Sequence, residues 1–253
     1  MKKLLLFIGL GILALNSCSK DNTETAISIN KRPIIRNKNG VIFTYTYDGN
    51  KIIQCENNWG DKWVYTYTGD LITKEDNYNY NVLRRSYEHT YENNKIATSI
   101  VKDYDIPLLF KSKSVYTYTS DTSVMRQIYS YVNNGYVTNT WQKSSLVKYT
   151  LIDGHITIEE ILKTDGTSNS TTVYEYDSKN NVFKNVLGFD KLIYKTDVSD
   201  DTKHNTINNI TRYYYAPTYR ELSFTFNYDT DNYPISKTWY NGNGISTETY
   251  TYQ

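Results

Sequence analysis

The stretch FTYTYDGNKI, residues 43–52, contains the pattern that decides the fold. Phe43, Tyr45 and Tyr47 occupy alternate positions, so on an extended chain they share one face, while the intervening threonines share the other. The Asp-Gly pair that follows tolerates the positive φ angles of a tight hairpin turn. These ten residues therefore predict a strand, a short turn and the start of a returning strand.

Variants of this stretch recur along the whole chain. Aligned on the second aromatic residue, the copies fall at Tyr47, Tyr67, Tyr91, Tyr118, Tyr176, Tyr228 and Tyr252, with a weaker copy at Leu151. Their spacing drifts, which argues against a rigid solenoid and suits successive hairpins whose outer loops vary in length. The step from Tyr176 to Tyr228 is about twice the usual one. It predicts that one unit between 177 and 228 has been replaced or heavily modified.

The fold class that follows is all-β. We expect a long antiparallel meander of about 13–16 strands, which forms a curved, barrel-like sheet in a single domain over residues 33–253. The alternation fails at NNVFKNVLGFDKLIYKTD, residues 180–197. This failure predicts one irregular or short helical insertion near 180–205, which would plug or cap the sheet. The pattern leaves open whether the sheet closes.

The N-terminus has the features of an export signal. Lys2 and Lys3 precede an apolar run over residues 4–15, which is shorter than the roughly 20 residues of a membrane-spanning helix. The sequence that ends at Cys18, Leu-Asn-Ser-Cys, resembles the lipobox of bacterial lipoproteins. The resemblance implies a signal peptide over 1–17, lipidation of Cys18 and a flexible tether over 18–32, with sorting to the outer membrane. The leaflet face stays open.

Composition narrows the class of partner. Without residues 1–17 the chain carries 26 basic and 27 acidic side chains, so it offers no basic footprint for nucleic acid. If Cys18 is lipidated, Cys55 has no disulfide partner and is predicted to be a half-buried strand residue. Tyrosine occurs 27 times, which suits a thin sheet whose side chains combine a buried ring with a polar hydroxyl. The membrane is expected to contact the protein through the lipid anchor only.

The chain offers few groups for catalysis. Of the three histidines, His89 lies in an aromatic row, His155 is expected at an ordinary surface position, and His204 follows an acidic loop that is either solvated or a weak cation site. The segment 229–240 begins like a calcium loop but lacks its glycine and its closing glutamate. No nucleophile elbow, phosphate loop or paired cysteine motif occurs. We therefore predict no enzyme activity, no metal site and no cofactor.

Exposed aromatic rings are the candidate binding groups. Four tryptophans are expected at outer turns or strand ends, where they could stack on sugars: Trp59, Trp63, Trp141 and Trp239. The alternative is that these rings cover a sheet without a second layer, where cross-strand aromatic pairs each contribute about 0.2–1 kcal/mol.

Two resemblances bear on the architecture. The phrases YTYDGN, YEYDSK and FNYDTD resemble the YD repeats of Rhs-type toxin shells, although their usual continuation is missing. The lipobox, the serial hairpins, the interruption KNNVFKNVLGFDKL at 179–192 and the final hairpin resemble an uncharacterised family of lipoproteins from gut and oral Gram-negative bacteria. That family is described as a domain of unknown function with a porin-like fold. The resemblance implies a strongly curved or barrel-like sheet and no assigned activity.

The functional hypothesis is a non-catalytic, lipid-anchored cell-envelope protein. It would bind a glycan, a peptide or an envelope partner; a structural or assembly accessory of an envelope complex is the alternative, and a hydrolase is less favoured. A membrane pore is disfavoured because the faces opposite the tyrosines carry threonine and charged residues, whereas a membrane barrel needs an apolar outer band.

Overall fold

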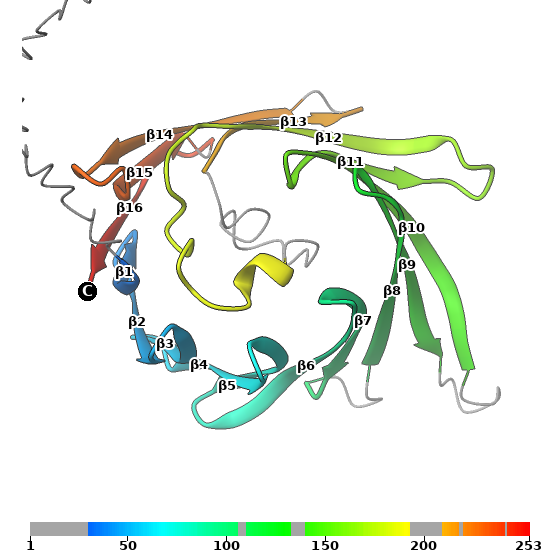
Figure 1. Cartoon of the computed structure of the whole chain (residues 1–253), viewed down its shortest axis with the longest axis horizontal. Coiled ribbons are helices and arrows are strands. Elements are labelled where there is room, and N and C mark those ends of the chain that lie inside the picture. The colour runs from blue at the N-terminus through cyan, green and yellow to red at the C-terminus, as the bar shows by residue number, and fades with distance from the viewer. Residues whose placement is uncertain (1–29, 106–109, 133–139, 193–208, 218–219, 241) are drawn as a thin grey trace, which may run out of the picture.

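The protein is a closed antiparallel barrel of sixteen strands, in which each strand pairs with its neighbours in sequence and the last strand pairs with the first (Figure 1). The computed structural model describes residues 30–105, 110–132, 140–192, 209–217, 220–240 and 242–253. The strands are β1 (Pro33–Lys38), β2 (Val41–Asp48), β3 (Lys51–Asn57), β4 (Asp61–Thr68), β5 (Leu71–Asn79), β6 (Val82–Glu92), β7 (Lys95–Asp103), β8 (Phe110–Ser120), β9 (Ser123–Val132), β10 (Thr140–Ile152), β11 (His155–Leu162), β12 (Ser168–Tyr176), β13 (Ile210–Ala216), β14 (Arg220–Tyr228), β15 (Pro234–Tyr240) and β16 (Ile245–Tyr252). The all-β prediction is confirmed, and the sheet closes. No helix among these residues is long and apolar enough to cross a membrane.

The repeated phrase forms a ring of side chains inside the barrel. In seven hairpins and at the β16–β1 closure, the second aromatic residue of the phrase, or Leu151 in its place, lies opposite a buried aliphatic residue or proline. Tyr47, for example, lies opposite Ile52. The eight buried partners are Pro33, Ile52, Ile72, Ile96, Val124, Ile156, Ile210 and Pro234. A β-bulge beside most of these pairs sharpens the bend of the strand. The alternation of apolar and polar residues therefore places one ring of closely packed side chains at the end of the barrel where these hairpins turn.

The tyrosine hydroxyls of this ring join neighbouring hairpins. The main-chain ladder between β7 and β8 stops at Thr98 and Val115, before the end of β8. Beyond that point the hydroxyl of Tyr118 donates a hydrogen bond of 3.1 Å to the carbonyl of Ile96. The same bond recurs in four other places: Tyr47 to Pro33 (2.7 Å), Tyr91 to Ile72 (2.6 Å), Tyr176 to Ile156 (2.5 Å) and Tyr252 to Pro234 (2.7 Å). We call these five bonds the tyrosine clamps.

The long step between Tyr176 and Tyr228 marks a modified hairpin and not a replaced one. Strands β12 and β13 pair directly, with Tyr176 opposite Ile210. The extra residues form one long inner turn of this hairpin. Its described first part, residues 177–192, is irregular and contains a single 3-10 turn, η1 (Phe189–Lys191), as the broken alternation predicts. The remainder of the predicted insertion, like His204, lies outside the described residues.

Residues 180–192, which we call the plug, fold back inside the barrel (Figure 1). Val182, Phe183 and Val186 are buried against Tyr45 and against side chains of the flanking strands. The plug is held by hydrogen bonds as well as by packing: the Leu187 amide donates to the Asn50 carbonyl (2.9 Å), the Tyr67 hydroxyl donates to the Leu187 carbonyl (3.1 Å), and the Asn185 side chain donates to the Lys31 carbonyl (2.9 Å). The hypothesis that the insertion plugs the sheet holds for this part of it.

The N-terminal residues before β1 are partly fixed. The predicted tether, 18–32, lies mostly outside the described residues, but its last two residues contact the barrel. Arg32 and Gln253 exchange two main-chain hydrogen bonds of 3.3 and 3.0 Å, and Lys31 forms ion pairs with Asp229 (2.7 Å) and Asp231 (2.5 Å). The barrel therefore begins two residues earlier than its first strand.

Removing one clamp should weaken the barrel measurably. Burial raises the pKa of Tyr91 above its usual range, so its hydroxyl keeps the proton that it donates to the Ile72 carbonyl. Tyr91→Phe deletes this bond and should lower the free energy of unfolding by about 1 kcal/mol in a denaturant titration. Tyr80→Phe is the control because Tyr80 is 75% exposed. Equal stability of the two variants would contradict a structural role for the clamps.

The contact between the plug and the barrel wall can be tested with alanine variants of two glycines that have the same backbone conformation. Gly188 has φ of 80°, and a Cβ there would lie 2.9 Å from the Asp70 carbonyl oxygen; Gly154 has φ of 79° and nothing within 4 Å of such an atom. Both alanine variants carry the left-handed strain, of order 1–3 kcal/mol. Only Gly188→Ala also pushes the plug away from the wall, so it should lower the melting temperature more than Gly154→Ala. The same melting temperature for both would show that the plug is loosely seated.

Candidate functional site

A second ring of side chains lies inside the barrel next to the first, and half of it is polar. On β5 and β6, a hydrogen bond of 3.0 Å joins Glu75 to Nε2 of His89, and both side chains are buried. His89 lies opposite Ser99, which in turn lies opposite Ser114 on β8. The Arg126 guanidinium on β9 donates to Ser114 Oγ (2.9 Å). A continuous polar path thus crosses the inner wall from β5 to β9.

The path continues through tyrosines and a carboxylate to β12. Arg126 also donates to the Tyr149 hydroxyl (3.3 Å), and Tyr149 lies opposite Glu159. The Tyr174 hydroxyl donates to Glu159 (3.0 Å). Burial raises the pKa of Tyr149 and of Tyr174, so both hydroxyls keep their protons at physiological pH. The ionisable groups of this polar path bond one another. This arrangement favours a structural network over a site for acid–base chemistry.

A separate buried ion pair closes the seam of the barrel. Arg36 on β1 contacts Glu248 on β16, and Lys237 on β15 lies 3.8 Å from the same carboxylate. All three side chains are at most 5% exposed. The cations also lie over rings: Arg36 over Phe43 at 5.2 Å and Lys237 over Phe224 at 4.3 Å. Sequence analysis missed this cluster because only the β1–β16 pairing brings residues 36 and 248 together.

Beyond these two rings, toward the outer turns of the hairpins, the inner wall carries half-buried side chains such as Asp61, Trp63 and Trp239. We call this region of β1, β2, β4 to β7 and β15 the mouth. Trp63 lies opposite Cys55 and Asn77 and packs against Phe43 at 6.4 Å. Asp61, two residues before Trp63 and on the same face, accepts hydrogen bonds from the side chains of Asn57 (3.0 Å) and Asn79 (2.7 Å).

The rest of the mouth adds charged groups and a second indole ring. Arg85 forms an ion pair of 2.6 Å with Asp103, and the Arg85 side chain is 43% exposed. Trp239 packs against Phe224 at 6.1 Å, with the Lys38 ammonium 5.7 Å from its centroid. Half-buried indole rings and hydrogen-bonding side chains therefore share the inner wall of the mouth.

The four predicted tryptophans do not form one surface. Trp63 and Trp239 lie on the inner wall of the mouth. Trp59 lies in the turn between β3 and β4 and is 62% exposed. Trp141 lies on the outer wall, against Tyr131 at 5.3 Å. The bulge between Lys143 and Ser145 shifts the alternation of β10 relative to Trp141, and it was not visible in the sequence.

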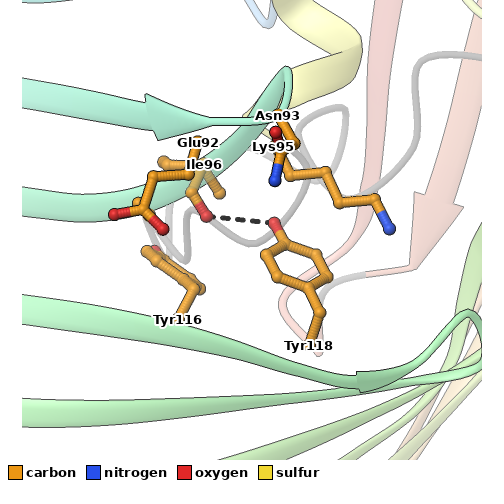
Figure 2. A pocket seen from close by; sticks show the side chains of 7 residues that line it. Glu92, Asn93, Lys95, Ile96, Tyr116 and Tyr118 are labelled. Atoms are coloured by element: carbon orange, nitrogen blue, oxygen red, sulfur yellow. Dashed lines mark hydrogen bonds between the residues drawn. The ribbon is translucent and has the colours of Figure 1, made fainter.

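A pocket of about 230 Å³ lies where β7 and β8 separate (Figure 2). Tyr116 and Tyr118 line one side, and the turn that carries Asn93 and Lys95 lines the other. The Tyr118 clamp crosses it, and the Lys95 ammonium lies 5.0 Å from the Tyr118 ring. Equivalent cations cover Tyr47 and Tyr67 in other hairpins. The pocket is therefore part of the repeated joint between hairpins.

The remaining residues singled out in the sequence pack or pair with other residues of the fold. His155 stacks on Tyr176, with 5.1 Å between the ring centroids. It covers this tyrosine as Lys95 covers Tyr118. Cys55 is a free, buried cysteine, more buried than predicted, and Cys18 lies outside the described residues. The described part of the chain contains no group of three or more His, Cys, Asp or Glu that could hold a metal ion. The two aspartates at the start of 229–240 bind Lys31.

Comparisons with known proteins find similarity among solved structures. No family model matches the chain, and no curated protein matches it. The resemblance to the uncharacterised lipoprotein family therefore stays a prediction. Among solved structures, a crystal structure of a porin-like protein from Bacteroides uniformis aligns with 84% of this chain and 77% of that chain, at 13% identity and a TM-score of 0.37. The closed sixteen-strand barrel is established by the strand register of the chain itself.

Proposed function

We propose that the protein is a non-catalytic, lipid-anchored binding module of the bacterial cell envelope, which takes a sugar residue in the mouth of its barrel. The observation that carries the proposal is the contrast between the two faces of the wall. The mouth combines indole rings with amide, carboxylate and guanidinium groups, whereas the outer face is polar along most of the barrel.

The side chains of the outer wall favour a barrel that is surrounded by water. Cross-strand ion pairs lie on this face between β6 and β7, between β10 and β11, and between β12 and β13: Glu88 with Lys102 (2.5 Å), Glu160 with Lys148 (3.1 Å) and Glu175 with Arg212 (2.7 Å). Placing Lys or Arg on the lipid face of a membrane barrel costs about 2–4 kcal/mol at the bilayer midplane. Such a barrel would need another attachment, and the lipobox at Cys18 supplies one that is compatible with a place at the outer membrane.

The mouth has the chemistry that recognises a pyranose. The C–H face of a sugar ring packs on an aromatic ring, while its hydroxyl groups need donors and acceptors at fixed positions. Trp63 offers the ring. Asp61, oriented by two asparagine amides, offers an acceptor whose carboxylate has lone pairs beyond the two bonds it already receives. Arg85, held by Asp103, offers a donor on β6, two strands from Trp63 and Asp61.

An assembly accessory is the second candidate function. Apolar side chains are exposed beside the seam of the barrel, on β1, β2, β15 and β16: Ile35, Ile42, Ile235, Tyr240 and Ile245. A protein partner that covers this region would favour the second candidate, and crosslinking in envelope membranes would detect it.

The sugar-binding proposal is tested by two tryptophan variants on opposite faces of the wall. Trp63→Ala should weaken binding at least about tenfold, since it removes the stacking ring, and Trp141→Ala should leave binding unchanged. A glycan array identifies the ligand, and isothermal titration calorimetry measures the affinity of each variant. Failure of the wild-type protein to bind any host or dietary glycan, or equal binding by Trp63→Ala, would refute the proposal.

The lipid anchor is tested by a pair of cysteine variants. Cys18→Ala should lose the acyl mass and should be absent from the outer-membrane fraction, because the lipidated residue is gone. Cys55→Ala, at the buried free cysteine of β3, should keep the acyl mass and should remain in the outer-membrane fraction. Mass spectrometry and membrane fractionation provide the measurements. Acylation that persists in Cys18→Ala would contradict the lipobox assignment.

A further inference from the structure

The outer wall of β8, β9 and β10 carries a basic and aromatic patch. Two rows of side chains cross these strands toward the mouth end of the barrel. In the first row Tyr129 lies opposite both Lys113 and Lys143. In the second row Tyr131 lies opposite Trp141, and the Lys111 ammonium lies 5.2 Å from the Tyr131 ring. We call these residues the basic patch: Lys111, Lys113, Tyr129, Tyr131, Trp141 and Lys143.

The charge of the basic patch is not balanced by the surrounding wall. The three strands contain no Asp or Glu at all. No carboxylate of the described residues pairs with the three patch lysines, whereas Lys102 and Lys148 beside the patch each have a glutamate partner. Lys111 also lies directly opposite Lys102, and like charges in that position destabilise a sheet. A counter-charge from outside the protein would relieve this repulsion.

The shape of the basic patch suits an elongated ligand. Lys113 and Lys143 lie two strands apart, a separation of about 10 Å between their backbones. Trp141 is 39% exposed at the edge of this row. Lysine side chains that flank aromatic rings on a continuous sheet offer charge pairing and ring stacking to the same ligand.

The basic patch faces away from the strand where the chain enters the barrel. Strand β9 is eight places from β1 in a ring of sixteen, and the two lie on opposite sides of the barrel (Figure 1). A protein held by its N-terminus would therefore present this wall away from its attachment. This placement favours a soluble polyanion over the lipid headgroups of the anchoring membrane.

We propose that the basic patch binds an acidic polysaccharide, with carboxylate or sulfate groups on the lysines and a sugar ring on Trp141. The patch is separate from the mouth and does not depend on sugar binding there. Binding is electrostatic in large part, so it weakens as salt is added.

The experiment titrates the full-length protein with polygalacturonate, heparin and neutral dextran, and measures affinity by calorimetry at low and high salt. The wild-type protein should bind at least one acidic polymer and not dextran. The triple variant Lys111→Glu, Lys113→Glu and Lys143→Glu should bind at least tenfold more weakly, as should the milder triple change of the same lysines to Gln. Trp63→Ala, which removes the mouth ring, should bind the acidic polymers as well as the wild type does.

The matched control reverses the same number of charges elsewhere. Lys95, Lys163 and Lys184 are exposed and lie outside the patch, so their triple Glu variant has the same net charge as the patch variant. It should keep most of the affinity. Equal loss in both triple variants would mean that net charge alone drives binding. Binding to phosphatidylglycerol vesicles without binding to either acidic polymer would assign the patch to a membrane. Either outcome, or no binding at all, would overturn the proposal.

Discussion

The hydrogen bond from a tyrosine hydroxyl to the carbonyl of the preceding hairpin is the interaction on which this barrel depends. Within a hairpin, main-chain bonds run up to the turn, but between hairpins the ladder stops short of it. Carbonyls beyond the end of this ladder need other partners, and at five of these joints a tyrosine supplies both a ring and a donor. Phenylalanine would supply the ring alone. The joints between hairpins thus explain why tyrosine recurs at this position of the repeat.

The insertion after β12 adapts the same device to another purpose. Where it enters the barrel, two tyrosines of the ring bond the inserted chain instead of a neighbouring hairpin: Tyr67 bonds the Leu187 carbonyl, and Tyr228 bonds the Asp177 carboxylate. The plug therefore uses positions that the repeat already provides. It also supplies apolar side chains that the aliphatic-poor strands lack, and these give the barrel a packed core at this end.

Much of this architecture could be predicted from local patterns. The period of two, the turn residues and the position of the second aromatic residue gave the strands, the hairpins and the inward face. The polar path could not be predicted, because Glu75, His89 and Arg126 belong to one path only through the strand register across several hairpins. For the same reason, Trp63 and Trp141 look equivalent in the sequence but lie on opposite faces. The long step after Tyr176 left two alternatives open, because spacing alone does not distinguish a modified unit from a replaced one.

Closure by the first and last strands has a consequence for how the protein is made. Until Tyr252 has left the ribosome, β1 has an open edge and Arg36 lacks its Glu248 partner. Fifteen strands can form hairpins in sequence order, but the ring is complete only when the final residues arrive. Every partial chain is an exposed sheet, ready to pair with another copy of itself. A chaperone that shields strand edges would therefore matter most during synthesis. Loss of a few C-terminal residues would weaken closure and so destabilise the whole barrel.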